Sequence, residues 1–233
     1  MGYIHLFQTV NEFNSAFTNN YVEPWVSYTK ESSAVTYNKP DPFNGHAYVD
    51  LDLPSGTLWA TCNVGATSPE EYGSFFAWGE IFEKSAYSWS NYRFGENSGS
   101  LTKYNATDGK ITLDLDDDAV ATNWGGEWRM PTRAECEELI STANTTSAWT
   151  TVNGINGIQL TSKANGNAIF FPAAGYNDVS VVDRGNGAHV WSSTHGDETP
   201  FSDELYGMSF RVRLTSNDRY LGYSVRGVVG VSS

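Results

Sequence analysis

Aromatic residues and glycines make up an unusually large share of this chain. The 233 residues include 8 Trp, 13 Tyr, 12 Phe and 22 Gly, and only 18% are charged, against roughly 25% in an average globular protein. Large rings need partners to pack against, and glycine weakens helices. The composition therefore favours short strands joined by turns and disfavours a helical bundle. The length allows one large domain, or one domain with a small appendage.

The acidic balance of the chain limits its partners. The formal net charge is −13 and no run of Lys or Arg is present, whereas nucleic acids and anionic membranes attract basic patches. We therefore expect no nucleic-acid partner. No stretch approaches the ~18 consecutive apolar residues of a spanning helix, so we expect no membrane insertion. The first residues lack a basic region followed by an apolar run, so no signal peptide is visible.

Residues 1–42 form a separate leader in this interpretation. Thr9 and Glu12 make a capping box ahead of apolar residues at helical spacing, which predicts a helix over 9–18. Two β-rich runs within 21–38 predict a hairpin, and a proline-containing linker follows them. An element this small cannot hold a full core alone. We expect it to dock on the main domain or on another protein.

The remainder, 43–233, is expected to be mostly β-structure with one dependable helix. That helix is predicted over 132–143, because Thr132 and Glu135 form a capping box directly after a proline. Asn-Gly pairs predict hairpin turns between some strands. Residues 173–204 are expected to be mainly loop, and such a length suggests a working surface. The predicted strands cover residues 47–53, 58–64, 150–152, 158–162, 168–171, 205–214 and 220–229.

Several long motifs occur in order along the chain. They are Val49-Asp50-Leu51-Asp52-Leu53-Pro54-Ser55-Gly56-Thr57-Leu58-Trp59-Ala60-Thr61-Cys62-Asn63-Val64-Gly65-Ala66, Phe76-Ala77-Trp78-Gly79-Glu80, Asn123-Trp124-Gly125-Gly126-Glu127-Trp128-Arg129-Met130-Pro131-Thr132, Phe171-Pro172-Ala173-Ala174-Gly175-Tyr176, Trp191-Ser192-Ser193 and Gly222-Tyr223-Ser224-Val225-Arg226. In these motifs and their order the chain resembles the major paralogous domain first named for Fibrobacter succinogenes. The resemblance covers about residues 48–229 and implies an α+β domain of C-type lectin-like fold, in the branch shared with formylglycine-generating enzymes.

Within that family, the chain resembles the variable proteins of diversity-generating retroelements. There a reverse transcriptase rewrites a C-terminal stretch by mutating adenines, and mutated asparagine codons cannot encode Lys, Gln, Glu, Met or Trp. No lysine follows Lys163 and no glutamine follows Gln159. The resemblance implies a hypervariable region over about 176–221.

The function implied is recognition of a bacterial surface protein or glycan, with the chain displayed on a phage tail or a cell surface. The leader would attach it to a structural protein of the tail or surface, and a homo-trimer is a possible assembly. A bacterial adhesin of the same fold without hypermutation is the alternative, and a purely structural virion domain is a third interpretation.

The candidate binding residues lie between the motifs of the C-terminal region. Strand alternation places Arg211 and Arg213 on one face, with Val212 on the other. Arginine and aromatic residues are favoured anchors of interfaces, although the loop valines could simply pack and the two arginines be solvated. The candidates are Asn177, Asp178, Val179, Val181, Asp183, Arg184, His189, Val190, Phe201, Ser202, Arg211, Arg213, Tyr220 and Leu221.

The tryptophans and two arginines of the motifs are expected to support the fold. We interpret the rings as core rather than as sugar-stacking platforms, with indole N–H groups donating to loop carbonyls. Arg129 and Arg226 are expected to pair with acids. The tryptophans concerned are Trp59, Trp78, Trp124, Trp128 and Trp191.

No metal, cofactor or catalytic site is expected. Asp114, Asp116 and Asp118 have a calcium-loop spacing, but Ala119 occupies the position that needs glycine. Solvated acids, or a cap on a segment over 119–123, are the preferred interpretation. Lectin tripeptides Glu-Pro-Asn and Gln-Pro-Asp do not occur, and the four histidines lack metal-ligand spacing.

The two cysteines do not match the copper-binding pair of formylglycine-generating enzymes. Cys136 stands at a packing position of the resembling helix motif, and Cys62 belongs to a motif of the scaffold. They form either one bridge or, as we prefer, two small buried hydrophobic positions. We therefore expect the protein not to be an enzyme.

Overall fold

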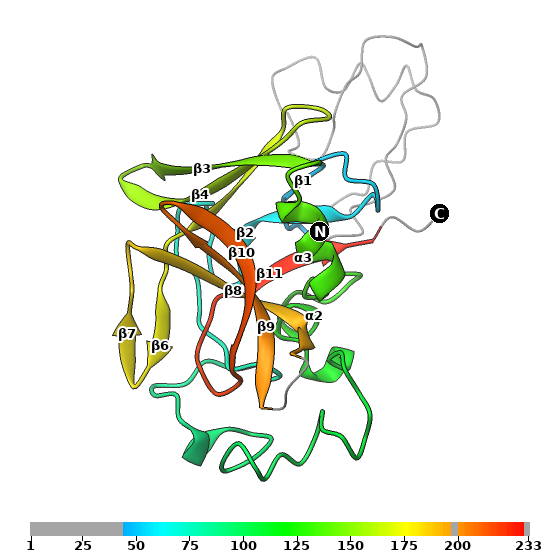
Figure 1. The fold of residues 1–233 in the computed structure, drawn as a ribbon, viewed down its shortest axis with the longest axis vertical. Helices are drawn as coiled ribbons and strands as arrows, with labels where there is room; N and C mark the ends of the chain where they lie inside the picture. Colours follow the sequence, from blue (N-terminus) through cyan, green and yellow to red (C-terminus); the bar gives the residue numbers. More distant parts are fainter. Residues whose placement is uncertain (1–43, 197–199, 231–233) are drawn as a thin grey trace, which may run out of the picture. The chain divides into compact units, whose positions relative to one another are not determined.

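The computed structural model describes residues 44–196 and 200–230. Their regular secondary structure is mostly β-strand, with two short α-helices and two 3₁₀ turns (Figure 1). None of the described helices is long and apolar enough to cross a membrane. The predicted leader, with its helix and hairpin, lies outside the described residues.

The sheet that positions the site has three antiparallel strands in the order β10–β9–β8. These strands are β8 (Gly187–His195), β9 (Phe201–Met208) and β10 (Arg211–Asp218). Successive side chains of a strand point to opposite faces. On one face, Leu205 and the partly exposed Val212 pack in an apolar core with residues of α3 and β4, so the other face is left for display.

A second three-stranded sheet covers part of that core. Its strands are β3 (Thr145–Val152), β4 (Ile155–Ser162) and β5 (Ala168–Pro172). Asn153 and Gly154 have φ of 48° and 85° and join β3 to β4 as the expected two-residue turn, because both positions of a type I′ turn require positive φ. This part of the sequence prediction is confirmed, although β3 is longer than expected.

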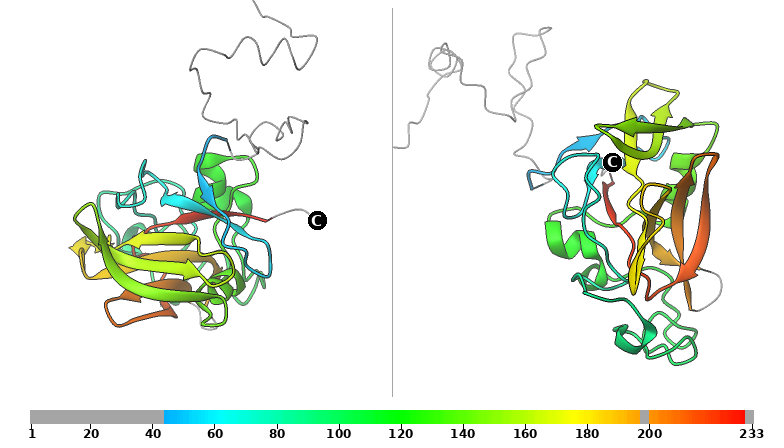
Figure 2. Two further views of the ribbon diagram at one scale, coloured as in Figure 1. Left: turned by 90° about the horizontal axis from the view of Figure 1, so that it is seen from above. Right: turned by 90° about the vertical axis from the view of Figure 1, so that its left-hand side faces the viewer.

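The third sheet joins the start and the end of the described chain. It comprises β1 (Tyr48–Val49), β2 (Leu58–Asn63) and β11 (Arg226–Val229), and Figure 2 shows it on the far side of the core from the β8–β10 sheet. Only two residues of the predicted 47–53 strand pair. The predicted alternation persists beyond them, because Leu51 is buried between two exposed aspartates.

Arg226 fastens this sheet to β5. Its guanidinium donates to the carbonyls of Ala60, Thr61 and Phe170 and to Asn63 Oδ1 at 2.8–3.0 Å. The side chain is fully buried and has no ion pair among the described residues. The expectation of an acidic partner for Arg226 was therefore wrong; backbone carbonyls take that role.

The predicted helix is confirmed as α3 (Arg133–Ile140), although it ends before residue 143. Thr132 caps its N-terminus and Glu135 completes the capping box. Arg129 pairs with Glu135 at 2.6 Å, as expected for that arginine. The shorter helix α2 (Ala119–Trp124) is capped by Asp118, which accepts from the N–H groups of its first turn.

The tryptophans of the motifs belong to the buried interior of the domain, which we call the frame together with the buried Arg226. Trp59, Trp78, Trp128 and Trp191 are at most 1% exposed, and Trp124 is half-buried against the same core. The indole N–H groups of Trp78 and Trp191 donate to the carbonyls of Ser192 and Phe76 at 2.9 and 3.0 Å. The interpretation as core is confirmed for these rings, while Trp59 Nε1 has no hydrogen-bond partner among the described residues.

Two predictions for the C-terminal half were wrong. Residues 173–204 are not mainly loop, since they contain β6 (Tyr176–Asp178), β7 (Ser180–Val182), β8 and the start of β9. The predicted strand 205–214 is instead a hairpin in which β9 turns at residues 209–210 into β10. Buried strands covered on both faces do not show the alternation that identifies a half-exposed strand. From residue 220 to 225, the chain makes only isolated bridges before β11 begins.

Candidate functional site

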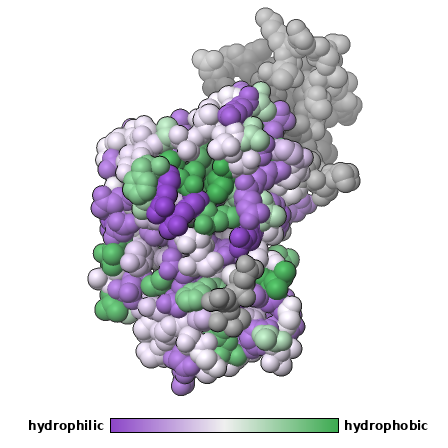
Figure 3. Space-filling model, in the orientation of Figure 1, coloured by the Kyte–Doolittle hydropathy of each residue, from purple (hydrophilic) through white to green (hydrophobic). Residues whose placement is uncertain are grey.

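The displayed face of the β8–β10 sheet carries a row of chemically distinct side chains. Cross-strand register places His189 of β8 opposite Tyr206 of β9, and Tyr206 opposite Arg213 of β10. Directly opposed residues share a face, so an imidazole, a phenol and a guanidinium lie side by side. Figure 3 shows strongly hydrophilic residues beside apolar ones on the side of the molecule that carries the β9–β10 hairpin.

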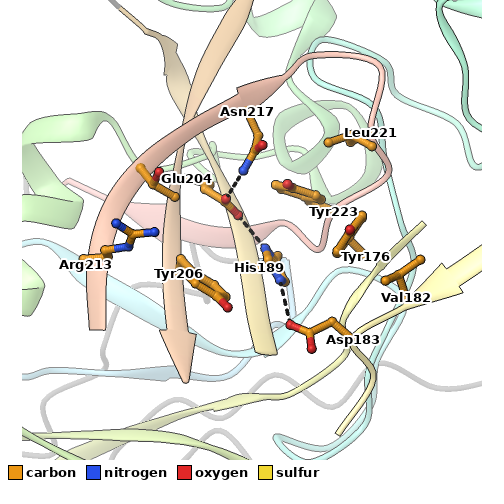
Figure 4. Close-up of a pocket in the computed structure, with 11 residues that line it drawn as sticks. Tyr176, Val182, Asp183, His189, Glu204, Tyr206, Arg213, Asn217, Leu221 and Tyr223 are labelled. Carbon is orange, nitrogen blue, oxygen red and sulfur yellow. Dashed lines mark hydrogen bonds and ion pairs between the residues drawn. The ribbon is translucent and has the colours of Figure 1, made fainter. Parts of the chain in front are cut away.

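A pocket of about 400 Å³ lies over this row. The β6–β7 hairpin forms one wall, because Gly175 and Asn177 bridge to Ala188 and Gly222 and hold the hairpin beside the sheet. Figure 4 shows the two sides of the pocket, with Arg213 on one and Val182 on the other. The lining residues are Tyr176, Val182, Asp183, His189, Glu204, Tyr206, Arg213, Thr215, Asn217, Leu221 and Tyr223.

His189 links two carboxylates at the floor of the pocket. Its Nδ1 lies 2.9 Å from Glu204 Oε2 and its Nε2 lies 3.5 Å from Asp183 Oδ2 (Figure 4). Asn217 Nδ2 donates to the other oxygen of Glu204 at 2.7 Å. A neutral imidazole has one N–H and an imidazolium has two, so only the charged form donates to both carboxylates.

Glu204 is a buried acid at the centre of this network. Its side chain is fully buried, and burial raises the pKa of its carboxyl, although the hydrogen bond from His189 and the charge of Arg213 oppose the rise. An ionised carboxylate in such a place needs a positive partner. His189 and Asn217 are the hydrogen-bond partners of the Glu204 carboxyl at this buried position.

Tyrosine rings surround the imidazole. His189 stacks on Tyr206 at a centroid distance of 4.5 Å, and the rings of Tyr176 and Tyr223 are each 5.0 Å away. Burial raises the pKa of all three phenols, so the hydroxyls stay protonated at neutral pH. The pocket offers apolar ring surface together with hydroxyl donors.

Glycine is required beside the network. A Cβ on Gly187 would lie 2.3 Å from Asp183 Oδ2 and 2.9 Å from His189 Nε2. Gly175 has φ of 70°, and a Cβ there would lie 2.1 Å from the carbonyl oxygen of Val182. Side chains at these positions would push the β6–β7 hairpin and Asp183 away from the sheet.

The β6–β7 hairpin ends in an apolar tip. Val179 is 72% exposed and has φ of 63°, a region that β-branched residues rarely adopt. Val181 and Val182 are also exposed. These valines are exposed to solvent. The alternative interpretation of the sequence, in which they pack within a loop, is therefore wrong.

The structure brings together only some of the predicted binding residues. Asp183, His189, Arg213 and Leu221 line the pocket. Asn177, Asp178, Val179 and Val181 belong to the hairpin wall, and Arg211 is exposed on β10. Arg184 lies over the ring of Tyr72, Tyr220 contacts Trp89, and Phe201 is half-buried at the start of β9.

Two predicted site residues are corrected by their burial. Val190 is 3% exposed and packs in the core, and Ser202 is fully buried. Both were expected in loops, whereas both lie within strands. Val190 alternates with the displayed His189 and therefore faces inward. Neither side chain is available to a ligand at the surface.

Most of the pocket lining was missed from the sequence. Thr215 and Asn217 continue the face of Arg211 and Arg213 along β10, so strand alternation could have found them. Glu204 and Tyr206 become visible only when the β9–β10 register is known. The remaining missed lining residues are Tyr176, Val182 and Tyr223.

The acidic run near residue 114 is occupied by ion pairs and caps. Asp114 accepts from Lys103 and Lys110, and these hydrogen bonds lower its pKa to about 2. Asp117 pairs with Arg93 and Lys103. Within the described residues, no group of three or more His, Cys, Asp or Glu side chains is arranged to hold a metal ion.

The histidine of the pocket is paired with acids. Among the described residues, the hydrogen-bond partners of the His189 ring are carboxylates, so no hydroxyl or thiol nucleophile is paired with it. Cys62 and Cys136 are free thiols, half-buried and buried. Burial raises the pKa of the Cys136 thiol, which makes it unreactive.

Comparison of the chain with protein-family models, curated proteins and solved structures finds no match. The interpretation of the site therefore depends on its own geometry and on the motifs of the sequence.

Proposed function

We propose that the chain is a ligand-binding variable protein of a diversity-generating retroelement, built on a C-type lectin-like fold. In this proposal it is displayed on a phage tail or a cell surface and recognises a bacterial surface molecule. The leader attaches it to its carrier. The pocket face of the β8–β10 sheet and the β6–β7 hairpin make the contacts.

The observation that carries the proposal is that the two faces of the β8–β10 sheet have different roles. One face of these strands packs in the core with Leu205, while the opposite face presents Tyr206 and Arg213. Exposed substitutions away from special features usually change stability by less than about 0.5 kcal/mol. A surface supported in this way can change its contacts without loss of the fold.

The residue types of the pocket also support the proposal. Ten of the eleven lining residues are of types that adenine mutation of asparagine codons can encode. Glu204 is the exception, and it is fully buried beneath the pocket. In the proposal Glu204 is a constant anchor, as are Tyr176 and Tyr223 of the motifs, and the other lining residues are open to change.

Binding to bacterial cells tests the function. The full chain is labelled and applied to a panel of gut bacterial isolates, and a strain that binds is used for comparison of variants. Tyr206→Ala and Arg213→Ala are expected to lower binding by about tenfold or more each, as truncated interface anchors do. Lys163→Ala, an exposed control whose Nζ donates to the carbonyl of Thr142, is expected to bind like the parent.

The outcomes separate the proposal from its alternatives. Undiminished binding of both pocket variants would overturn the proposed site. Binding that depends on the pocket, together with a gene that lacks a neighbouring reverse transcriptase and an adenine-differing repeat, would indicate an adhesin without hypermutation.

A further inference from the structure

The basic residues of this acidic chain fall into two groups. Every described lysine or arginine before residue 140 has a carboxylate within 4.0 Å; these are Lys84, Arg93, Lys103, Lys110, Arg129 and Arg133. Arg211 and Arg213 have no carboxylate at that distance within the described residues, although acids outnumber bases by 27 to 14 in the chain. The exposed Lys163 and Arg184 have no such carboxylate either, but Arg184 lies over the ring of Tyr72, whereas Arg211 and Arg213 share the pocket face.

Both guanidiniums are held in place by aromatic rings. Arg211 lies 5.2 Å from the centroid of Phe210, and Arg213 lies 5.7 Å from that of Tyr206. Stacking restricts the planar group and leaves its N–H donors free for an acceptor. The two residues alternate on one strand and are therefore about 7 Å apart along it. This arrangement is preorganised for an anionic group.

The rest of the pocket fits a molecule with hydroxyl groups. Within the described part of the chain, the hydrogen-bond contact of the Asp183 carboxylate is with the His189 ring, so the carboxylate retains acceptor capacity for a hydroxyl. The Thr215 side chain lines the pocket as well, and Tyr176 contributes ring surface. The volume of about 400 Å³ exceeds that of an Asp or Glu side chain and accommodates one sugar residue.

We propose that the pocket binds one acidic sugar residue of a glycan, with the sugar carboxylate held by Arg213 and supported by Arg211. A carboxylate accepts two parallel N–H bonds from a guanidinium. Asp183 and Thr215 pair with ring hydroxyls, and the tyrosine rings contact the apolar face of the sugar. This inference rests on the proposed ligand-binding function and specifies the chemistry of its target.

The test uses calorimetric titration of the full chain with acidic sugars and with their methyl esters. The probes are glucuronic, galacturonic, mannuronic and N-acetylneuraminic acid, each as a short oligosaccharide. Esterification removes the charge and keeps the ring, so at least one acid is expected to bind about tenfold or more tightly than its ester. Arg213→Met is expected to abolish that difference, and Lys163→Met is expected to keep it.

Three results would overturn the inference. These are equal affinity for acids and esters, the same preference in the Arg213→Met variant, and absence of binding by all the probes while an Asp-rich peptide binds. Cell binding that still depends on Tyr206 and Arg213 would leave the proposed function standing in each case. The failure of the sugar assignment is therefore distinguishable from failure of the function.

Discussion

Replacement of Arg226 by methionine is expected to cost a large part of the stability of the domain. The guanidinium makes four hydrogen bonds, to Asn63 and to the carbonyls of Ala60, Thr61 and Phe170. A buried acceptor left without a donor costs about 1–3 kcal/mol. The substitution also removes an unfavourable contribution, the desolvation of the buried guanidinium. This desolvation lowers the pKa of Arg226 to about 9.

Four acceptors lose a donor and the relief of the desolvation offsets part of that cost, so the net loss is expected at about 3–5 kcal/mol. For a domain of this size it corresponds to a fall in Tm of about 6–20 °C. Urea unfolding followed by tryptophan fluorescence measures it. Arg213→Met makes the same chemical change on the displayed face and is expected to cost about 0.5 kcal/mol or less. A cost below about 1 kcal/mol for Arg226→Met, or equal costs for the two variants, would refute the reasoning.

Two further predictions concern the α3 cap and the pocket. Burial alone would raise the pKa of Glu135, but hydrogen bonds from Arg129 and Thr132 outweigh burial and lower it. The ionised Glu135 therefore stabilises the fold at pH values above its ordinary pKa of 4.5, and this stabilisation is lost as the pH falls. Glu135→Gln is expected to reduce the free energy of unfolding by about 1–3 kcal/mol at neutral pH and by less near pH 3; a difference that grows on acidification would contradict this. Gly187→Ala, which has no room beside Asp183, is expected to weaken binding by about tenfold, whereas Gly230→Ala, in open space, is expected to bind like the parent.

Local signals in the sequence were sufficient for several elements. The capping box at Thr132 and Glu135 begins α3 as expected, and Asn153-Gly154 joins β3 to β4. In these cases the residues that decide the structure are neighbours in the chain. Side-chain caps and positive-φ turns need no distant partner.

Strands β8 and β9 were missed because their stability depends on distant partners. β9 contains two adjacent acids, Asp203 and Glu204, and acidic side chains are rarely buried without a partner. Arg133 pairs with the first at 3.0 Å, and His189 with the second at 2.9 Å. The turn at 209–210 contains neither glycine nor proline, so no turn signal separates β9 from β10.

The same dependence explains the partial prediction of the site. Alternation correctly placed Arg211 and Arg213 on one exposed face. The pocket also needs Tyr206 from the neighbouring strand and Tyr176 from the hairpin, and these positions follow from register and packing. Composition and spacing do not specify them.

The central claim is that the displayed face can change while the frame cannot. The most direct measurement is the free energy of unfolding of a chain in which five exposed residues of the β6–β7 hairpin, the β9–β10 turn and strand β10 are replaced by serine together. We predict a total cost of about 2.5 kcal/mol or less, smaller than that of Arg226→Met alone; failure to fold, or a cost above that of the single frame variant, would contradict the account. The five residues are Val179, Val181, Phe210, Arg211 and Arg213.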